Sequence, residues 1–191
     1  MASLKDLRNK IKSIKSIQQV TNAMKMVAAA KLRKSQESME NTRPYTSAIE
    51  EMIIHLIPDV DRSMLPILEA REISKKLLVV VTADRGMAGA FNANVIKTTE
   101  QLVDDFGSKN CFLICIGKKS HDYFKRRDYQ IIEHYRDFWN SLNVNKAISI
   151  GDMIVSKYLN KDFDAVTVVY NEFINVGSQK IVSKQLLPIY D

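Results

Sequence analysis

Apolar side chains recur every three or four positions along the first part of the chain. They are Leu4, Leu7, Ile11, Ile14, Ile17, Val20, Met24 and Val27. This spacing predicts a helix with one apolar stripe, closer to coiled-coil spacing than to a straight-helix period. Pro44 is the only helix breaker between residues 3 and 57. We therefore expect one long helix over residues 1–57, kinked at Pro44, that packs against a partner helix.

The pattern changes after a connection at residues 58–75. Continuous apolar runs predict strands at 76–83, 111–117, 130–135 and 164–173, with a further strand-like segment at 180–189. Helical segments are expected at 92–106, 119–126 and 143–159. This alternation predicts an α/β fold for residues 76–191, a doubly wound, mostly parallel, Rossmann-like domain with helices on both faces of the sheet.

Positive charge is concentrated in the predicted helix. Residues 1–34 carry nine Lys or Arg against one acid, a net charge of +8, within a chain whose net charge is +6. Lys5, Arg8, Lys12 and Lys15 form a ridge beside the apolar stripe. A basic helix on a nearly neutral body indicates an anionic partner, such as nucleic acid, an acidic membrane surface or an acidic protein groove.

The cysteines and the hydropathy pattern restrict the class of protein further. Cys111 and Cys115 would lie on one face of a strand roughly 13 Å apart, too far to bridge, so we interpret them as reduced thiols in the core. No apolar stretch approaches the roughly 20 residues of a membrane span, and the first residues lack the apolar segment of a signal peptide. We therefore expect no direct insertion into a membrane.

Candidate chemistry in the α/β region is sparse. The turn "DRGMAGAFN" follows a strand and opens a helix, where an anion could bind, but it lacks the dinucleotide and P-loop patterns. His55, His121 and His134 are expected to lie far apart, without metal-ligand spacing. Ser120, His121 and Asp122 are adjacent on a helix and cannot form a triad. We therefore expect no catalytic group, no cofactor and no metal.

Several strings in the chain resemble the gamma subunit of the F-type ATP synthase. They are "LRNKIKSIKSIQQVTNAMKMVAAAKLRKSQ" in the predicted helix, "RPY" at 43–45, "TADRGMAGAFNANV" at 82–95, "NEFIN" at 171–175 and "QLLP" at 185–188. The resemblance implies that the helix is half of a central shaft, an antiparallel coiled coil in the bore of the alpha and beta subunits. It also implies that the α/β domain is the foot, near the epsilon subunit and the membrane c-ring.

The resemblance further implies a mechanical, non-catalytic role. Rotation of the asymmetric shaft would couple ATP synthesis or hydrolysis on the beta subunits to ion flow. Shaft packing is expected from Leu7, Ile11, Ile14, Ile17 and Val27. Contacts to the alpha and beta subunits are expected from Met24, Lys25, Lys31, Arg33, Lys34, Arg85 and Lys97, with Lys31, Arg33 and Lys34 continuing one cationic side of the helix.

The chain departs from the family pattern at its C-terminal end. The second shaft helix of the family is not found after "LLPIYD", so the stripe is expected to lack its usual partner within this chain. The cytoplasmic face of a bacterial inner membrane is the expected location, in preference to a mature mitochondrial form. Two alternatives stay open: a basic helix that binds duplex nucleic acid, and an enzyme with a nucleotide at the strand ends.

Overall fold

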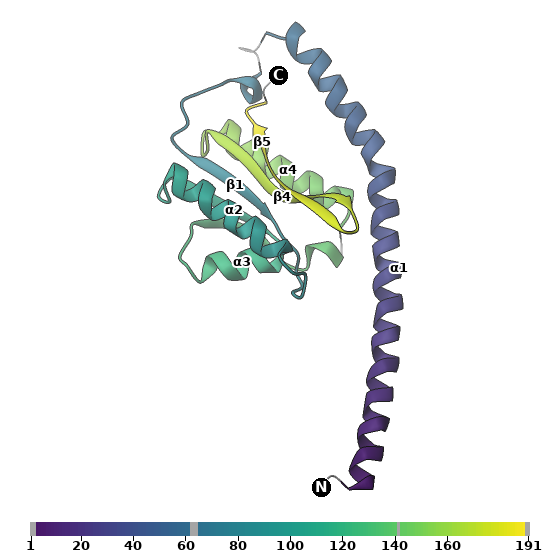
Figure 1. Ribbon diagram of the computed structural model, residues 1–191. Helices are drawn as coiled ribbons and strands as arrows, with labels where there is room; N and C mark the ends of the chain where they lie inside the picture. The colour runs from purple at the N-terminus through teal and green to yellow at the C-terminus, as the bar shows by residue number, and fades with distance from the viewer. Residues whose placement is uncertain (1–2, 62–64, 141, 190–191) are drawn as a thin grey trace. The chain divides into compact units, whose positions relative to one another are not determined.

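The computed structural model describes residues 3–61, 65–140 and 142–189. These fall into two compact units, Met1–Asp59 and Val60–Asp191. The first unit is a helix of 53 residues, α1 (Leu4–Leu56), which leads into a 3-10 turn, η1 (Ile57–Asp59) (Figure 1). The Ser3 side chain accepts a hydrogen bond from the Lys5 backbone, and Asp6 accepts one from the Ser3 backbone, which starts the helix with a capping box. The helix continues through Pro44 without a break.

The second unit alternates strands and helices along the chain. Its elements are η3 (Pro66–Leu68), β1 (Lys76–Val81), α2 (Phe91–Phe106), β2 (Cys111–Ile116), α3 (Lys118–Lys125), β3 (Ile131–Tyr135), η4 (Phe138–Asn140), α4 (Val144–Leu159), β4 (Ala165–Asn175) and β5 (Ser178–Leu187). The sheet order is β3-β2-β1-β4-β5. The first four strands are parallel and β5 is antiparallel to β4. The predicted α/β fold with a mostly parallel sheet is therefore confirmed.

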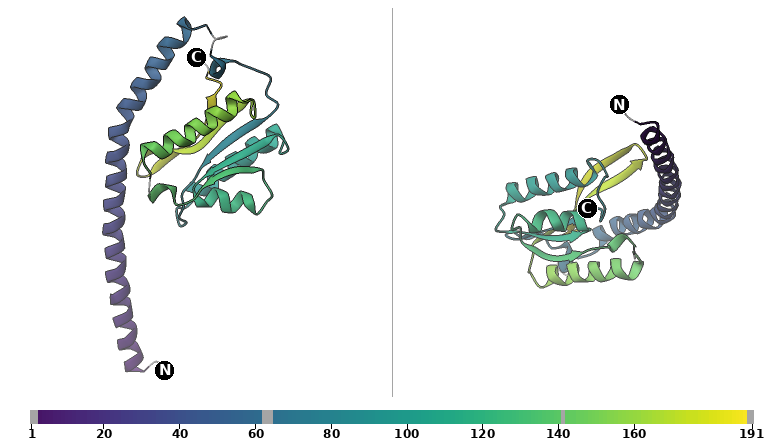
Figure 2. Two further views of the ribbon diagram at one scale, coloured as in Figure 1. Left: turned by 180° about the vertical axis from the view of Figure 1, so that it is seen from behind. Right: turned by 90° about the horizontal axis from the view of Figure 1, so that it is seen from below.

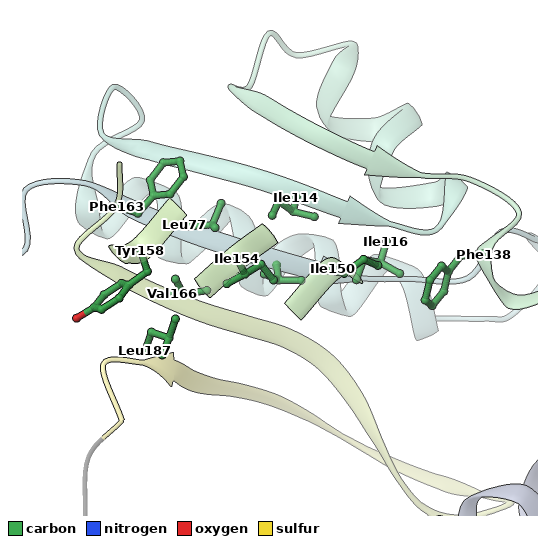
Figure 3. Packing of buried hydrophobic residues seen from close by; sticks show 11 residues of the cluster. Leu77, Ile114, Ile116, Phe138, Ile150, Ile154, Tyr158, Phe163, Val166 and Leu187 are labelled. Atoms are coloured by element: carbon green, nitrogen blue, oxygen red, sulfur yellow. The ribbon is translucent and has the colours of Figure 1, made fainter. Parts of the chain in front are cut away.

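Side chains alternate between the two faces of the sheet, and each face has its own core. Leu77, Ile114 and Val166 pack with Ile150 and Ile154 of α4 on one face (Figure 3). Leu78, Val80 and Leu113 pack against α2 and α3 on the other face, and α2 and α4 lie on opposite sides of the sheet (Figure 2). Strands buried on both faces need continuous apolar runs, which is the pattern that the sequence shows.

Both cysteines lie in the core that faces α2 and α3. Cys111 and Cys115 are buried and unbridged, as the sequence predicts. Burial raises the pKa of the Cys115 thiol to about 12, although a hydrogen bond with Ser120 acts in the opposite direction. The thiol therefore stays protonated at neutral pH, and a protonated thiol is a poor nucleophile.

The order of the strands reverses between β1 and β4. The chain runs outward from β1 through β2 to β3 and then crosses to the other side of β1 to form β4. The start of β1 is fixed by Asp164, whose carboxylate accepts hydrogen bonds from the backbone N–H groups of Ser74 and Lys75. Burial alone would raise the pKa of Asp164, but the hydrogen bond from the Ser74 hydroxyl, the two backbone hydrogen bonds and Arg71 lower it overall.

Candidate functional site

The apolar stripe of α1 is exposed along the helix. None of the described residues of α1 is buried, and Ile14 and Ile17 keep 56% and 64% of their surface accessible. Fully burying one such side chain contributes about 1.5–3 kcal/mol, and the five predicted packing residues keep about half of their surface accessible, so a partner that covered them would gain on the order of 5 kcal/mol. Those residues are Leu7, Ile11, Ile14, Ile17 and Val27. A contiguous exposed stripe of this kind marks an interaction surface.

The five predicted contact residues on α1 do not share one side of the helix. Successive helical residues are about 100° apart, so Lys31 lies about 20° from Met24 around the axis, whereas Arg33 lies about 180° from it. Lys25 and Lys34 lie about 100° and 80° away, in opposite directions. Lys31, Arg33 and Lys34 themselves lie within a sector of about 160° and Lys25 lies outside it, so the expectation that these three residues continue one cationic side stays a prediction.

Most of these cations are available for a partner. Arg33 Nε donates to Glu37 Oε1 at 2.9 Å, and both side chains are exposed. Pairs of this kind on a helix surface are worth about 0.2–0.5 kcal/mol. Lys25, Lys31 and Lys34 make no ion pair with any residue that the structure describes. An acidic partner would thus compete with at most one weak intramolecular pair.

Arg85 lies on the turn between β1 and α2, and the first residue of "NANV" holds this turn together. Asn92 Oδ1 accepts a hydrogen bond from Ala83 N at 2.9 Å, and Asn92 Nδ2 donates to Arg85 O at 3.3 Å. One side chain thus joins both ends of the turn, while Arg85 itself is exposed. Beyond Arg85, Met87 is fully exposed and has a left-handed backbone, with φ of 58°.

Asp84 ties the same turn to two other segments. Asp84 Oδ1 accepts hydrogen bonds from the backbone N–H groups of Lys118 at 2.9 Å and Asp137 at 3.1 Å. These contacts connect the carboxyl end of β1 to the start of α3 and to the segment after β3. The turn is therefore organised before any partner binds, which lowers the conformational cost of binding through Arg85.

Lys97 lies on α2 at the rim of a basic hollow of about 740 Å³. Lys119, Arg126 and Arg127 also line this hollow, together with the glycines of the turn, Gly86 and Gly89. The sequence analysis did not select Lys119 or Arg126. Lys119 could have been found from the pair Lys118–Lys119, which follows Gly117 after β2, because the carboxyl ends of neighbouring parallel strands meet at one edge of the sheet. Arg126 lies at the C-terminal end of α3, and no sequence pattern indicates its place in the hollow.

Acidic and aromatic groups limit the charge of this hollow. Arg127 stacks on the Tyr123 ring, with its guanidinium carbon 3.7 Å from the ring centroid. The Tyr123 hydroxyl donates to Glu100 Oε1 at 2.9 Å, and this hydrogen bond raises the pKa of Tyr123. Lys97, Lys119 and Arg126 have no ion-pair partner among the described residues, so they are the groups most available to an anion.

Two of the three histidines are not far apart, contrary to the sequence analysis. The rings of His121 on α3 and His134 on β3 stack with centroids 4.1 Å apart. The sequence could not show this, because thirteen positions separate them and the contact depends on how α3 packs against β3. His55 belongs to α1. Among the described residues, no group of three His, Cys, Asp or Glu side chains could hold a metal ion.

The described helices were also compared with the requirements of a membrane span. None of them combines the length and the apolar character that crossing a bilayer requires.

Comparisons with known proteins agree on one family. A family model described as ATP synthase matches residues 3–191. The ATP synthase gamma chain of Prosthecochloris aestuarii is 45% identical over 99% of this chain and 67% of its own length. That of Chloroherpeton thalassium is 41% identical over 99% of this chain and 64% of its own length. The chain thus spans about two thirds of the length of these curated relatives.

Solved structures share the fold. The central stalk and c-ring structure of the Tetrahymena thermophila mitochondrial ATP synthase contains a chain with a TM-score of 0.71 and 24% identity, over 88% of this chain and 72% of that one. The rotor of the Euglena gracilis mitochondrial ATP synthase gives a TM-score of 0.57 and 18% identity, over 94% of this chain and 61% of that one.

Proposed function

Because this chain belongs to the family of ATP synthase gamma chains, we propose that it forms part of the central rotor stalk of an F-type ATP synthase. In this role it couples ion-driven rotation to ATP synthesis or hydrolysis at sites on the beta subunits. The observation that carries the proposal is α1 itself. It is a helix of 53 residues with no buried residue, an exposed apolar stripe and cations around its circumference.

The apolar stripe supports the shaft role. A helix of this length with an uncovered stripe requires a partner helix for stability in water. We propose that Leu7, Ile11, Ile14, Ile17 and Val27 pack against a second helix in an antiparallel coiled coil, and that this pair stands in the bore of the alpha and beta hexamer. The asymmetry of the pair then forces the three beta sites into different states.

The distribution of cations suits a shaft that turns. Met24, Lys25, Lys31, Arg33 and Lys34 point in different directions around α1, so some of them face the surrounding subunits at every angle. Exposed ion pairs are worth only about 0–1 kcal/mol each. Contacts between these long side chains and acidic loops therefore attract the shaft without holding it at one position.

We propose that the α/β unit is the foot of the stalk. Arg85 on its organised turn and Lys97 on the adjacent helix face the beta subunits, while other surfaces of the unit contact the epsilon subunit and the c-ring. The chain supplies no catalytic group, because the active sites lie on the beta subunits. The complex is peripheral, on the cytoplasmic face of a bacterial inner membrane, in keeping with the bacterial relatives.

Reconstitution tests this proposal. The chain is mixed with purified alpha and beta subunits of a bacterial F-type ATPase, and the complex is isolated by size-exclusion chromatography and assayed for ATPase. We expect co-elution at one chain per hexamer and an ATPase rate above that of alpha and beta alone. Elution of the chain apart from the hexamer at all salt concentrations would contradict the rotor role.

A pair of matched variants tests the cationic contacts. Lys31→Glu with Lys34→Glu should weaken association with the hexamer by about tenfold or more, because two attractions of up to 1 kcal/mol become repulsions. Lys109→Glu with Lys180→Glu makes the same change of charge at exposed positions of the α/β unit, and its association should be unchanged. Equal losses in both variants would show that only net charge matters.

The nucleic-acid alternative is tested in the same preparation. The comparisons give it no support. Addition of duplex DNA to the chain should give no salt-sensitive complex at physiological ionic strength, where a recognition helix would bind.

A further inference from the structure

The basic hollow lies between two helices on the same face of the sheet. α2 contributes Lys97, α3 with its C-cap contributes Lys119 and Arg126, and the turn before α2 contributes Gly86 and Gly89. Its volume of about 740 Å³ lies within the range for small-molecule sites, which is about 300–1,000 Å³. The hollow therefore has room for a ligand larger than a single ion.

The acidic groups of the lining do not neutralise its cations. Four cations and two carboxylates line the hollow. Asp122 Oδ1 pairs with Arg136, which lies outside the lining, at 2.9 Å. Glu100 Oε1 accepts a hydrogen bond from the Tyr123 hydroxyl at 2.9 Å. The hollow therefore keeps an excess of positive charge, which attracts anions.

Lys119 lies against the turn before α2. A Cβ atom placed on Gly86 would be 3.4 Å from Lys119 Nζ and 3.5 Å from Lys119 Cε, so the ammonium group lies beside the backbone of the turn. The backbone N–H groups of Gly86 and Gly89 donate to no described residue. These N–H groups are therefore available as further donors near the Lys119 end of the hollow.

The spacing of the cations indicates the length of a ligand. Lys119 and Arg126 are seven residues apart, which corresponds to a rise of about 10 Å along the helix axis. A ligand with negative groups at both ends contacts both side chains without bending either of them along the helix. A single phosphate group contacts only one of them in that arrangement.

The number of free cations indicates the charge density of the ligand. Lys97, Lys119 and Arg126 lie around one hollow without ion-pair partners among the described residues. Carboxylates on the same side of an extended peptide are about 7 Å apart, so an acidic peptide places only two charges within this length. A chain of phosphoryl groups carries a charge on each group, and the planar guanidinium of Arg126 can donate to two phosphate oxygens at once.

We propose that the basic hollow binds a linear oligophosphate, either free or as the phosphate chain of a nucleotide. Lys119 neutralises one end of the chain, Arg126 donates to the other end, and Lys97 supplies a further charge from α2. This site goes beyond the proposed rotor function. Lys97 also belongs to the proposed contact with the beta subunits, so the test changes only Lys119 and Arg126, which have no part in that contact.

Selective labelling of glycine tests the proposal on the full chain. The chain has six glycines, of which Gly86 and Gly89 line the hollow. Titration of ¹⁵N-glycine protein with tripolyphosphate should shift these two NMR signals saturably, with a Kd of about 1 mM or tighter. The signals of Gly151 and Gly177 should stay in place. Anions bound to the cations of α1 do not disturb this measurement, because α1 contains no glycine.

The absence of a saturable shift at Gly86 and Gly89, up to roughly ten times the expected Kd, would overturn the proposal. Equal shifts at all the glycines would show a general effect of ionic strength and would also overturn it.

Matched variants locate the anion. Lys119→Gln with Arg126→Gln should weaken binding of tripolyphosphate about tenfold or more, because two charge-assisted contacts are lost. Lys109→Gln with Lys180→Gln removes the same charge from exposed positions outside the hollow, and its Kd should stay within about twofold. Equal weakening in both variants would show that only net charge matters and would overturn the proposal.

A conservative variant covers the case in which the double variant of the hollow does not fold. Arg126→Lys keeps the charge and removes the planar guanidinium, so it should weaken binding about 3–10-fold. An unchanged Kd in this variant would contradict the contact assigned to Arg126.

Other ligands define the chemical class. Orthophosphate should bind about tenfold more weakly than tripolyphosphate, and equal affinity would overturn the requirement for a chain. ATP that binds as tightly as tripolyphosphate would identify nucleotides as a source of the phosphate chain, whereas much weaker binding of ATP would identify the free oligophosphate as the ligand. A hexaglutamate peptide that bound more tightly than tripolyphosphate would overturn the proposal in favour of an acidic protein segment.

Discussion

At the carboxyl edge of the sheet, single residues determine how closely two backbone segments can approach each other. Gly117, between β2 and α3, has φ of 101°, and a Cβ placed on it would lie 2.1 Å from the Thr82 carbonyl oxygen. Gly151 differs, because it lies within α4 and a Cβ there would meet nothing within 4 Å. The backbone at Gly117 therefore excludes a Cβ atom, whereas the backbone at Gly151 accepts one. Substituting each glycine by alanine tests this difference.

Alanine at Gly117 should destabilise the α/β unit, and alanine at Gly151 should stabilise it. For Gly117→Ala we expect a loss of at least about 2 kcal/mol in the free energy of unfolding, from backbone strain and the clash with Thr82. For Gly151→Ala we expect a gain of about 0.5–1 kcal/mol, since alanine favours the helix. Urea unfolding, followed by the fluorescence of Trp139, measures the free energy of unfolding of both variants. Equal changes in the two variants would contradict the different roles of these glycines.

His121 makes the stability of the α/β unit depend on pH. Burial lowers the pKa of His121 below its usual value of 6.5, and His134, Arg136 and Lys125 act in the same direction, while Asp122 opposes them. The unfolded chain therefore takes up the proton first as the pH falls. The contribution of His121 to stability is present above about pH 6.5 and is lost below it.

A pair of variants tests this dependence. His121→Gln should flatten the fall in unfolding midpoint between pH 7.5 and pH 5, because the buried ionisable group is gone. His55→Gln changes a histidine of α1 and should leave the pH dependence as it is in the unmodified chain. If both variants lose stability on acidification as the unmodified chain does, His121 is not the titrating group.

At the scale of elements, α1 carries a defect in its own hydrogen bonding. Pro44 lies inside the helix and has no N–H to donate to the carbonyl of Glu40, so one helical hydrogen bond is missing. An interior proline is about 3 kcal/mol less favourable than alanine. The helix should therefore open most readily around this position.

Pro44→Ala should strengthen this part of α1. Amides of residues 41–48 should exchange with solvent at least about tenfold more slowly, because local opening becomes costlier. Ser47→Ala is the control: it changes only the small difference in helix propensity between serine and alanine, about one turn away. It should slow the exchange by a smaller factor than Pro44→Ala does. Hydrogen exchange measured by NMR distinguishes them, and identical exchange in both variants would mean that the proline does not limit opening.

Most elements could be predicted because their apolar patterns are strong. The runs at residues 76–81 and 111–116 are buried on both faces, and the observed strands lie inside the predicted ranges. The direction of β5 could not be predicted, since hydropathy does not report whether the last strand is parallel. The hydrogen bonds of Asp84 to Lys118 and Asp137 and the stacking of His121 on His134 were also missed, because each depends on packing between different elements of the fold. The hydrogen bonds of Asn92 were missed although they are local, because they depend on the conformation of the turn between β1 and α2.

At the scale of the whole molecule, the two units differ in what they bury. The α/β unit has two hydrophobic cores, whereas no described residue of α1 is buried. An uncovered apolar stripe favours association with any complementary surface. Without its partners, this chain should therefore associate with itself through α1.

Sedimentation velocity tests this expectation. The unmodified chain should show a concentration-dependent increase in sedimentation coefficient, and Ile11→Glu with Ile17→Glu should abolish it by placing charges on the stripe. Val144→Glu with Ile148→Glu puts the same charges on exposed apolar positions of α4 and serves as the control. A chain that stays monomeric at every concentration would contradict the role assigned to the stripe.

The reversal of strand order between β1 and β4 also has a consequence for biosynthesis. Val80 pairs with Val169, so the centre of the sheet cannot close until most of the chain has left the ribosome. Domains of this kind fold as units once their distant segments are present. Throughout that interval α1, which precedes the sheet in the sequence, presents its apolar stripe to the solvent. The nascent chain is therefore expected to need a chaperone to shield α1 until the sheet has formed and assembly can begin.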